Sequence, residues 1–446
     1  MTKPIIIKNV ITKFKKKIIV DGDKSLSIRF ALLASQAIGK SRAYNLLKSE
    51  DVLSTLDCLK KLGVKIKWDK KYKFCEINGN GLNSFIYRDN LTLNGNNSGT
   101  CIRLLTSLLI NSPKKIKLIG DKSLSKRDMK RIIMPLKEFG ATFYPKNKNN
   151  LPIYIRGTNY LRPINYLEFR GSSQCKSSVM LAALSAAGVT RLKCKPSRNH
   201  TELLFKYLKI PIKVKKTKNF DFIEIQGKQN FKSFNYNIPS DISSSAFFIV
   251  LTLLSKNSSL ILKQVGINKS RNGVITILNK MKAKIILKNK KIYKGEKIAD
   301  IHVRSKKTLK SINCPTKFNS NAIDEFLIIF LAAAKAKGVS YFKNLEELNK
   351  KESRRLDWAS KILNMIGVKT KLIGNHGIKI WGQPNLKLSK NYEVKNYLKD
   401  HRVMAMSTIA ALTLGGNWKI HDPDSINTSF PSFFKIIKKD LGAKIN

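Results

Sequence analysis

LKKLGVKI, residues 59–66, joins the end of a helical pattern to the start of a strand pattern, and variants of it recur along the chain. The other copies are LKEFGATF (136–143), YLKIPIKV (207–214), LNKMKAKI (278–285), LNMIGVKT (363–370) and IKKDLGAKI (437–445). Glycine directly after a helix is the residue that most easily adopts the left-handed stop. The third and fourth copies lack it, so the repeat is inferred from the whole set. Copies spaced about 70 to 85 residues apart predict a small α/β module used six times.

Each copy also opens with small polar or charged residues that lead into a strongly apolar helix. These openings are KSLSIRFALLAS (24–35), NSGTCIRLLTSLL (97–109), SSQCKSSVMLAAL (172–184), SDISSSAFFIVLTLL (240–254), IDEFLIIFLAAA (323–334) and DHRVMAMSTIAAL (400–412). A helix that is apolar on nearly all sides is buried. Capping explains Ser, Asn, Thr and Asp at its start.

Four cations in these openings are not explained by capping, because a positive charge opposes the positive end of the helix dipole. They are Arg29, Arg103, Lys176 and Arg402. A cation at a buried helix N-terminus makes sense if an anion binds there, held by the side chain and the N–H groups together. The openings therefore predict an anion site built from several helix ends.

The length of 446 residues predicts two or three domains, and 42% hydrophobic residues are enough for real cores. Six modules divide naturally into three and three, and YNIPSD around Pro239 is a plausible boundary. We expect an α/β protein of two domains, with the helix ends aimed at a shared cleft. The N-terminal strand could pair with either half.

The formal charge of +56, from 85 Lys and Arg against 29 Asp and Glu, leaves two interpretations open. A nucleic-acid-binding protein would use such a charge, and its binding would weaken steeply with salt. However, short runs such as KFKKK, KKYK and KNKK are scattered along the whole chain. With abundant Ile and Asn, they are typical of an A/T-rich coding sequence, which favours a solvated surface that still attracts small anions.

Other function classes lack their sequence signals. Six cysteines show no metal-ligand spacing and are expected to be reduced thiols, in the core or at the surface. The N-terminus has no signal-peptide pattern, and FLIIFLAAA (326–334) is too short to span a bilayer. Nucleotide-binding glycine loops, zinc-protease and acyl-serine motifs are missing. We expect a cytoplasmic protein with no metal, no membrane contact and no specific nucleic acid.

Two clusters carry reactive groups. Asp324 stands at the head of an apolar helix, where a carboxylate facing cations would stay ionised and could act as a general base. EELNKKESRRLDW (346–358) is expected to place Lys351 and Arg355 on one helical face, since they are four residues apart. A solvated, salt-bridged helix is the simpler interpretation of this second cluster. His401 is expected to orient its neighbours.

Eleven motifs occur in the same order as those of the EPSP synthases, and the chain resembles that family over nearly its whole length. They are GDKSLSIR (22–29), NNSGTCIRLL (96–105), GDKSLSKRDM (120–129), GSSQCKSSVMLAAL (171–184), SRNHTE (197–202), SDISSSAFF (240–248), NKSRNG (268–273), IDEF (323–326), ELNKKESRR (347–355), DHRVMAMS (400–407) and TSFPSFF (428–434). SSQ followed by KS, together with SRNHTE, resembles the bacterial class II subgroup.

The resemblance implies a two-domain enolpyruvyl-transferase fold of six βαβαββ units, with the active site in the interdomain cleft. The first domain would be residues 23–239, and the second would be 1–22 with 240–446. The implied reaction transfers the enolpyruvyl group of phosphoenolpyruvate to the 5-hydroxyl of shikimate 3-phosphate and releases phosphate, through a tetrahedral intermediate. No cofactor is implied, and a monomer is expected.

The resemblance also implies residue roles. Catalysis would rest on Asp324 as the base, Lys351 holding the hydroxyl, and Glu352 or Lys24 protonating the methylene carbon. Phosphoenolpyruvate would bind at Lys24, Asn97, Gly99, Arg127, Gln174, Arg355 and Arg402. Shikimate 3-phosphate would bind at Lys24, Ser25, Arg29, Ser172, Ser173, Gln174, Arg198, Asp324 and Lys351. Because Gly99 is not Ala, sensitivity to glyphosate is expected.

Some positions depart from the family pattern, although none carries an assigned role. They are Ile28, Asp128, Asn199, Asn349 and Arg354, and the last two alter charges beside Lys351 and Arg355. The sister enzyme that uses UDP-N-acetylglucosamine is a second candidate. Its loop cysteine acid is missing from GDKSLSKRDMKR (120–131).

Overall fold

The structure is a computed structural model that describes residues 3–69 and 71–446. Contacts within the chain divide it into two compact units. Unit 1 comprises Met1–Asp21, Pro239–Ile292 and Lys297–Asn446, and unit 2 comprises Gly22–Ile238 and Tyr293–Glu296. The units are defined by contacts alone, so the domains expected from the sequence stay a prediction.

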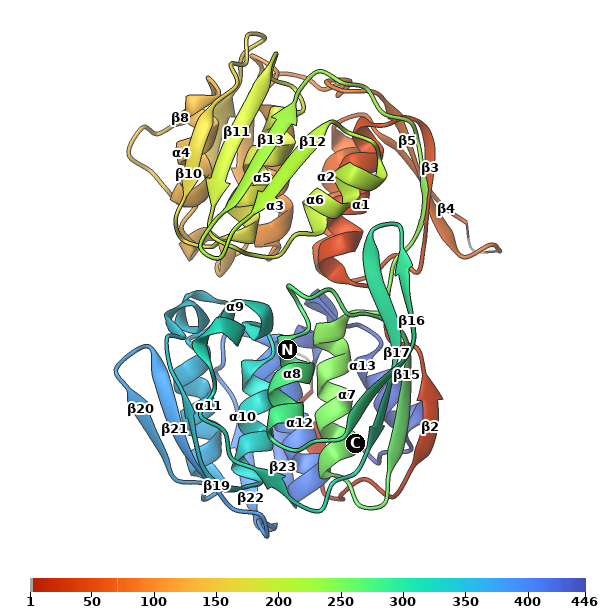
Figure 1. Ribbon diagram of the computed structural model, residues 1–446, viewed down its shortest axis with the longest axis vertical. Helices are drawn as coiled ribbons and strands as arrows, with labels where there is room; N and C mark the ends of the chain where they lie inside the picture. The colour runs from red at the N-terminus through yellow and green to blue at the C-terminus, as the bar shows by residue number, and fades with distance from the viewer. Residues whose placement is uncertain (1–2, 70) are drawn as a thin grey trace. The chain divides into compact units, whose positions relative to one another are not determined.

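The described residues of unit 2 form three four-stranded sheets, ordered β14-β3-β5-β4, β6-β7-β9-β8 and β10-β11-β13-β12 (Figure 1). The strands are β3 (Ile38–Tyr44), β4 (Lys65–Asp69), β5 (Phe74–Asn80), β6 (Leu91–Asn94), β7 (Lys115–Ile119), β8 (Thr142–Tyr144), β9 (Ile153–Arg156), β10 (Asn165–Glu168), β11 (Val189–Cys194), β12 (Ile212–Lys216), β13 (Asp221–Gln226) and β14 (Asn235–Asn237).

The described residues of unit 1 form three further sheets, ordered β16-β17-β15-β2, β18-β19-β21-β20 and β1-β23-β22. The strands are β1 (Ile5–Ile7), β2 (Lys15–Ile18), β15 (Ser259–Gly266), β16 (Ile285–Tyr293), β17 (Glu296–Arg304), β18 (Leu309–Lys310), β19 (Ala336–Phe342), β20 (Thr370–Ile373), β21 (Gly377–Gly382), β22 (Leu388–Val394) and β23 (Gly415–Ile420).

One pairing scheme repeats in all six sheets. The strand after the first helix of each module pairs parallel with one neighbour and antiparallel with the other. These central strands are β3, β7, β11, β15, β19 and β23. The α/β module inferred from the closures is therefore confirmed.

The first helix of each module is almost entirely buried, and these helices form the cores. They are α1 (Lys24–Gln36), α3 (Gly99–Leu109) and α5 (Ser173–Ala183) in unit 2, and α7 (Ile242–Leu254), α10 (Phe326–Ala334) and α12 (His401–Leu414) in unit 1. In unit 2, α3 contacts α1 and α5, and in unit 1 the three buried helices contact one another. Each unit has its own cluster of buried apolar residues.

A second helix, partly buried and partly exposed, follows in each of the first five modules. These helices are α2 (Glu50–Lys61), α4 (Lys130–Glu138), α6 (His200–Tyr207), α8 (Gly273–Lys280) and α11 (Arg355–Met365). In the sixth module the short α13 (Phe433–Lys435) continues as a π-helical turn at Ile436–Asp440, and a short α9 (Asn319–Ala322) precedes α10.

A residue with positive φ ends the second helix of every module. Four are glycines and two are lysines: Gly63 (85°), Gly140 (114°), Gly367 (81°), Gly442 (75°), Lys209 (58°) and Lys282 (65°). The two lysines occupy the places where glycine is missing from the repeat. Backbone geometry therefore repeats even where the residue type does not.

The N-terminal segment completes two sheets of unit 1. β1 pairs antiparallel with β23, and β2 pairs parallel with β15. The Ile6 N–H donates to the Asn446 carbonyl at 2.8 Å, and the Asn446 N–H returns a bond to Ile6 at 3.0 Å. The sheet of the sixth module thus takes its edge strand β1 from near the N-terminus, and Asn446 bonds to the backbone of that strand.

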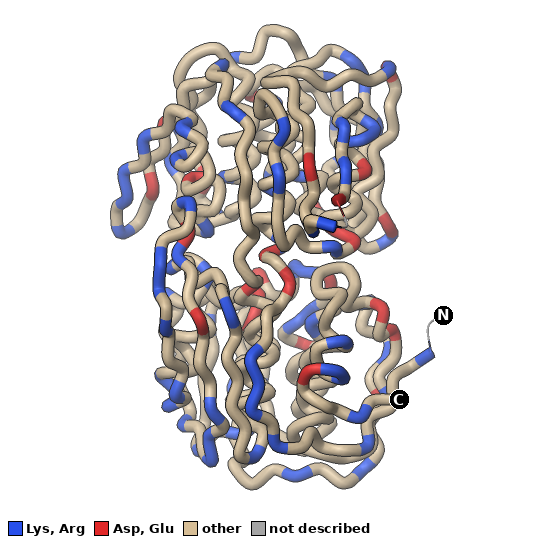
Figure 2. Tube along the Cα trace, turned by 90° about the vertical axis from the view of Figure 1, so that its right-hand side faces the viewer, with Lys and Arg blue, Asp and Glu red and all other residues tan. Residues whose placement is uncertain are grey.

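Lysine and arginine are spread along the trace in both units rather than gathered in one segment (Figure 2). This distribution agrees with the solvated-surface interpretation of the charge. Among the described residues, no helix is long and apolar enough to cross a membrane.

Candidate active-site residues in the two units

The buried helices of unit 2 begin with capped turns. The Asp23 carboxylate accepts from the Leu26 N–H at 2.8 Å, and the Ser98 and Ser172 hydroxyls accept from Cys101 at 3.2 Å and Cys175 at 3.3 Å. Ser98 and Ser172 therefore cap their helices, as the sequence predicted for small polar residues at the helix starts. Ser25 and Ser173 lie half-buried in the first turns of α1 and α5.

Gln174 links the first turns of α5 and α3. Its Oε1 accepts from Arg103 Nη1 at 2.7 Å, and its Nε2 donates to the Thr100 hydroxyl at 2.9 Å. Gly99 lies beside this contact, where a Cβ would stand 2.9 Å from Arg103 Nη1 and 3.4 Å from Arg127 Nη1. The absence of a side chain at Gly99 keeps both guanidinium groups in place.

Arg127 and Lys24 each contact a partner from another segment. Arg127 Nη2 donates to Asn97 Oδ1 at 3.0 Å, while Asn97 Nδ2 donates to Asp121 at 2.6 Å. Lys24 Nζ lies 2.7 Å from Asp51 Oδ2, and the Lys24 side chain keeps 22% of its surface exposed. Both cations are thus oriented by the fold and partly accessible.

Arg29 is buried, and its guanidinium joins three helices. Its Nε donates to Thr201 Oγ1 at 2.8 Å, its Nη2 to Ser177 Oγ at 2.8 Å, and its Nη1 to the Ser25 carbonyl at 3.1 Å. These bonds fasten α1 to α5 and α6. Arg198 lies half-buried on the loop before α6.

In unit 1, Asp324 lies next to two of the cations that the family motifs put with it. Its Oδ1 is 3.2 Å from Lys351 Nζ and 3.6 Å from Arg355 Nη1. Arg355 Nη2 also pairs closely with Glu352. The Asp324 side chain is 15% exposed, Lys351 27% and Glu352 20%, whereas Arg355 is only 2% exposed. The structure therefore brings the four residues together.

The backbone that carries this cluster differs from the helix expected for residues 346–358. A 3-10 helix covers Glu346–Lys350 and α11 begins at Arg355, so the residues between them are not helical. The prediction that Lys351 and Arg355 share a helical face is wrong. They meet through Asp324, because Lys351 adopts an extended conformation (φ −90°, ψ −156°).

The buried carboxylate of Asp400 holds the Arg355 guanidinium in place. Its Oδ2 accepts from Arg355 Nε at 2.9 Å and from the Ser353 hydroxyl at 2.9 Å, and its Oδ1 accepts from the N–H of Arg402 at 3.0 Å. Burial works to raise the pKa of the Asp400 carboxyl, but attraction to Arg355 and His401 and the hydrogen bond from Arg355 together hold that pKa below its ordinary value. Burial works to lower the pKa of Arg355, but Asp400, Glu352 and Asp324 together raise it.

The first residues of α12 carry the remaining candidates. Arg402 is the second residue of the helix and is 8% exposed. His401 Nδ1 lies 3.3 Å from the Thr428 hydroxyl, a contact suited to the orienting role expected for it.

Two departures from the family pattern support helix starts. Asp128 Oδ1 accepts from the Lys130 N–H at 2.6 Å at the head of α4. Asn349 Oδ1 accepts from the Leu356 N–H at 3.0 Å at the head of α11. Neither contact withdraws a partner from Lys351 or Arg355.

Sequence reasoning did not assign three residues that hold the candidates in place: Asp51, Arg103 and Asp400. Arg103 had a signal, since its charge at a helix start has no capping explanation. Asp400 precedes a helix, where aspartate is the ordinary cap, and Asp51 lies in the acidic first turn of α2. Because helix capping and the helix dipole already explain Asp400 and Asp51, the sequence gives no sign that they also hold Arg355 and Lys24.

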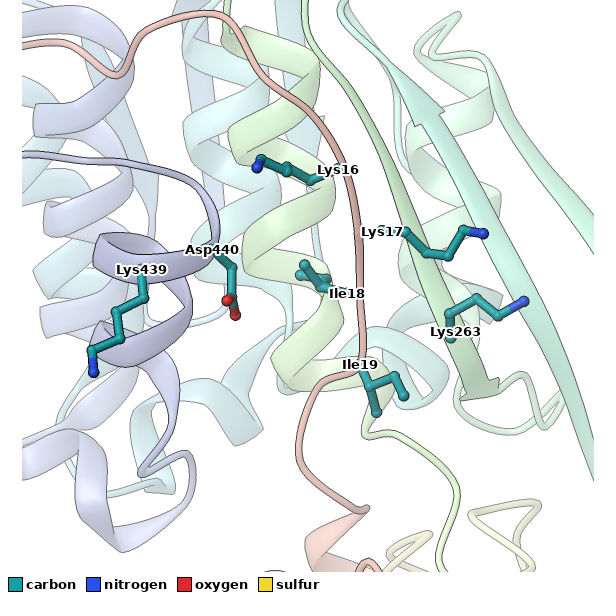
Figure 3. A pocket seen from close by; sticks show the side chains of 7 residues that line it. All are labelled: Lys16, Lys17, Ile18, Ile19, Lys263, Lys439 and Asp440. Atoms are coloured by element: carbon teal, nitrogen blue, oxygen red, sulfur yellow. The ribbon is translucent and has the colours of Figure 1, made fainter.

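A surface cavity of about 600 Å³ lies away from these residues, lined by Lys16, Lys17, Ile18, Ile19, Lys263, Lys439 and Asp440. Lys16 and Lys17 point to opposite sides of β2, and Lys439 points away from both (Figure 3). The lysine side chains that line this cavity therefore do not converge on one point. Among the described residues, no group of His, Cys, Asp and Glu side chains is arranged to hold a metal ion.

Comparison with known proteins identifies relatives over the whole chain. The sequence profile of EPSP synthase (3-phosphoshikimate 1-carboxyvinyltransferase) matches residues 8–437. A 3-phosphoshikimate 1-carboxyvinyltransferase of Ruthia magnifica is 38% identical over 96% of this chain and 95% of its own. The Zymomonas mobilis protein of that name is 35% identical over 100% of this chain and 98% of its own.

Solved structures agree with the sequence relatives. EPSP synthase from Acinetobacter baumannii superposes with a TM-score of 0.86 at 34% identity, covering 100% of this chain and 99% of that one. The enolpyruvyl transferase NikO from Streptomyces tendae shares the fold, with a TM-score of 0.76 at 14% identity over 100% of this chain and 99% of that one. The expected two-domain enolpyruvyl-transferase fold is confirmed, and the chain belongs to the EPSP synthase family.

Proposed function

We propose that this protein transfers the enolpyruvyl group of phosphoenolpyruvate to the 5-hydroxyl of shikimate 3-phosphate. The products are 5-enolpyruvylshikimate 3-phosphate and inorganic phosphate. The observation that carries this proposal is the cluster in unit 1, where Asp324 contacts both Lys351 and Arg355. Two cations beside this carboxylate favour its ionised form, which is the form that a general base needs.

The reaction balances as an addition followed by an elimination. Asp324 takes the proton of the 5-hydroxyl, whose oxygen bonds to C2 of phosphoenolpyruvate while the methylene C3 gains a proton from Glu352 or Lys24. The residue that protonated C3, Glu352 or Lys24, then takes a proton from the new methyl group of the tetrahedral intermediate, and the C–O bond to phosphate breaks to release inorganic phosphate. Lys351 neutralises the charge that develops on the attacking oxygen.

Anion binding supports the assignment of the other residues. Lys24, Arg127, Arg355 and Arg402 supply cations for the phosphate and carboxylate of phosphoenolpyruvate, a task for which Arg is suited. Asn97, Gly99 and Gln174 complete this group. Ser25, Arg29, Ser172, Ser173 and Arg198, with Lys24, Gln174 and Lys351, bind shikimate 3-phosphate. The proposal includes action as a cytoplasmic monomer that binds no specific nucleic acid.

Phosphate release tests the proposal, with each substrate omitted in turn. We expect release only when both substrates are present, and a loss of about 10²- to 10⁴-fold in kcat in Asp324→Asn, the range that general-base catalysis supplies. Asp357→Asn is the matched control, because it makes the same change at a half-exposed ion pair with Arg354 in the same unit. It should leave kcat within twofold.

Each other outcome has one meaning. Release with UDP-N-acetylglucosamine in place of shikimate 3-phosphate would assign the sister reaction. An active Asp324→Asn would retain the reaction and reject Asp324 as the base. No release from folded wild-type protein would reject the proposed function.

A further inference from the structure

Lys176, one of the four cations that the sequence places at a helix start, forms a buried ion pair in unit 2 and has no substrate contact among the roles proposed above. Lys176 lies on α5, two residues after Gln174, with 0% of its side chain exposed. Its Nζ is 2.6 Å from Glu202 Oε1 on α6, and Glu202 is 3% exposed. Burying two charges costs more than their attraction returns unless further bonds compensate, and an apolar pair would fill the same space at lower cost. The pair therefore does something that an apolar pair would not.

The same ammonium group reaches the loop between β11 and α6. Lys176 Nζ donates to the Ser197 carbonyl oxygen at 3.3 Å. Ser197 is followed by Arg198, which the proposed function assigns to shikimate 3-phosphate. Lys176 thus joins this loop to α5, the helix whose first turn carries Ser172 and Ser173.

A second set of hydrogen bonds, next to those of Lys176, also holds the first turn of α6. Ser177 and Thr201 share a hydrogen bond of 2.7 Å, and both accept from Arg29. Two consecutive residues of α5 therefore hold two consecutive residues of α6. The side chain of the α6 N-cap residue makes no capping hydrogen bond, and these contacts, together with the buried contact of His200 with Glu296 at 2.6 Å, hold the first turn of α6.

Lys176 also lies among other carboxylates. Burial raises the pKa values of Glu168 and Asp221, and attraction to Lys176 works against that rise for both. Glu168 in turn accepts from the N–H groups of Arg170 and Gly171 at 2.9 Å, in the turn that leads into α5. Lys176 therefore acts on the turn that leads into α5, through Glu168, and on the loop and helix start around Arg198, through Ser197 and Glu202.

We propose that Lys176, together with Glu202, is a positioning residue for the acceptor substrate. The pair sets the 197–199 loop against the first turn of α5, so that Arg198 and the two serines are held at the spacing that the phosphate of shikimate 3-phosphate requires. This inference rests on the proposed function. It assigns no contact between Lys176 and either substrate.

The decisive variant is Lys176→Met/Glu202→Met, which removes both charges and keeps side chains of similar length. Because no unpaired charge remains in the core, we expect thermal unfolding close to that of the wild type. The KM for shikimate 3-phosphate should rise about tenfold or more, as when a charged hydrogen bond to a phosphate is weakened. The KM for phosphoenolpyruvate and kcat should stay within threefold.

Lys206→Met is the matched control, since Lys206 is an exposed lysine of the same helix α6, and it should change none of these values. A double variant with a wild-type KM for shikimate 3-phosphate would overturn the inference and leave the pair a purely structural role. If the double variant does not fold, Lys176→Met/Glu202→Gln also leaves no unpaired charge in the core and keeps the shape of Glu202, and the same criterion for the KM decides. Failure of the wild type to turn over at all would instead reject the proposed function.

Discussion

Asp400→Asn should destabilise unit 1 without removing a residue that we assign to substrate. Asp400 is fully buried, and it holds Arg355, itself 2% exposed, through two bonds of 2.9 and 3.2 Å. Asparagine caps helices about as well as aspartate, so the change isolates the charge from the cap of α12.

The magnitude follows from the loss of one member of a buried ion pair, which costs about 3–5 kcal/mol. Arg355 keeps Glu352 and Asp324 as partners, so we expect the lower end, about 3 kcal/mol. For a unit of roughly 150–250 residues, that corresponds to a fall in Tm of about 6–12 °C. Asp357→Asn, at a partly exposed pair, should cost under about 0.5 kcal/mol.

The pH dependence gives a second signature. The pKa of Asp400 in the folded protein lies below its ordinary value of 3.8, so its charge stabilises the fold above that value, and the contribution is lost as the pH falls through the lowered pKa. Urea unfolding followed by circular dichroism should therefore show the full difference between wild type and variant at pH 7, shrinking below about pH 3.8. Equal stability at pH 7, or a difference that persists unchanged in acid, would refute this reasoning.

Three further substitutions probe the glycines and the repeat. Gly99→Ala places a Cβ 2.9 Å from Arg103 Nη1. The KM for phosphoenolpyruvate and the inhibition constant for glyphosate should therefore both rise about tenfold, which corresponds to the loss of one hydrogen bond. An unchanged KM in steady-state assays would contradict the assignment of Gly99 to the phosphoenolpyruvate site. Lys282→Gly should stabilise the protein by about 0.5 kcal/mol, because relief of a left-handed residue outweighs the added freedom of the unfolded chain. Gly367→Ala should destabilise it by about 1 kcal/mol although no atom lies within 4 Å of the new Cβ, since only φ is strained. If the urea midpoint falls in Lys282→Gly and rises in Gly367→Ala, the positive φ at these helix ends does not determine the stability of the two variants.

The sequence predicted the module well because helix closures and buried helix openings follow local rules. The closures at Lys209 and Lys282 were harder to recognise, since lysine replaces glycine while the backbone keeps its positive φ. These two closures are recognised by their spacing from the other copies of the repeat and not by the residue type at the helix end.

The candidate site was less predictable where chemistry depends on contacts between distant segments. Periodicity suggested a helix through Lys351, but the chain leaves helical geometry there, and a contact with Asp324, 27 residues earlier, brings the groups together. Asp400 acts on Arg355 across 45 residues. No spacing rule within one element encodes such pairs, so they required the fold.

The most direct test of the proposed reaction is to run it in deuterium oxide and examine the methylene group of the enol ether product by NMR. Addition followed by elimination passes through a methyl group that takes one hydrogen from solvent. The account therefore predicts deuterium in the product methylene, together with stoichiometric phosphate. A product formed at full turnover with no deuterium at that carbon would contradict it.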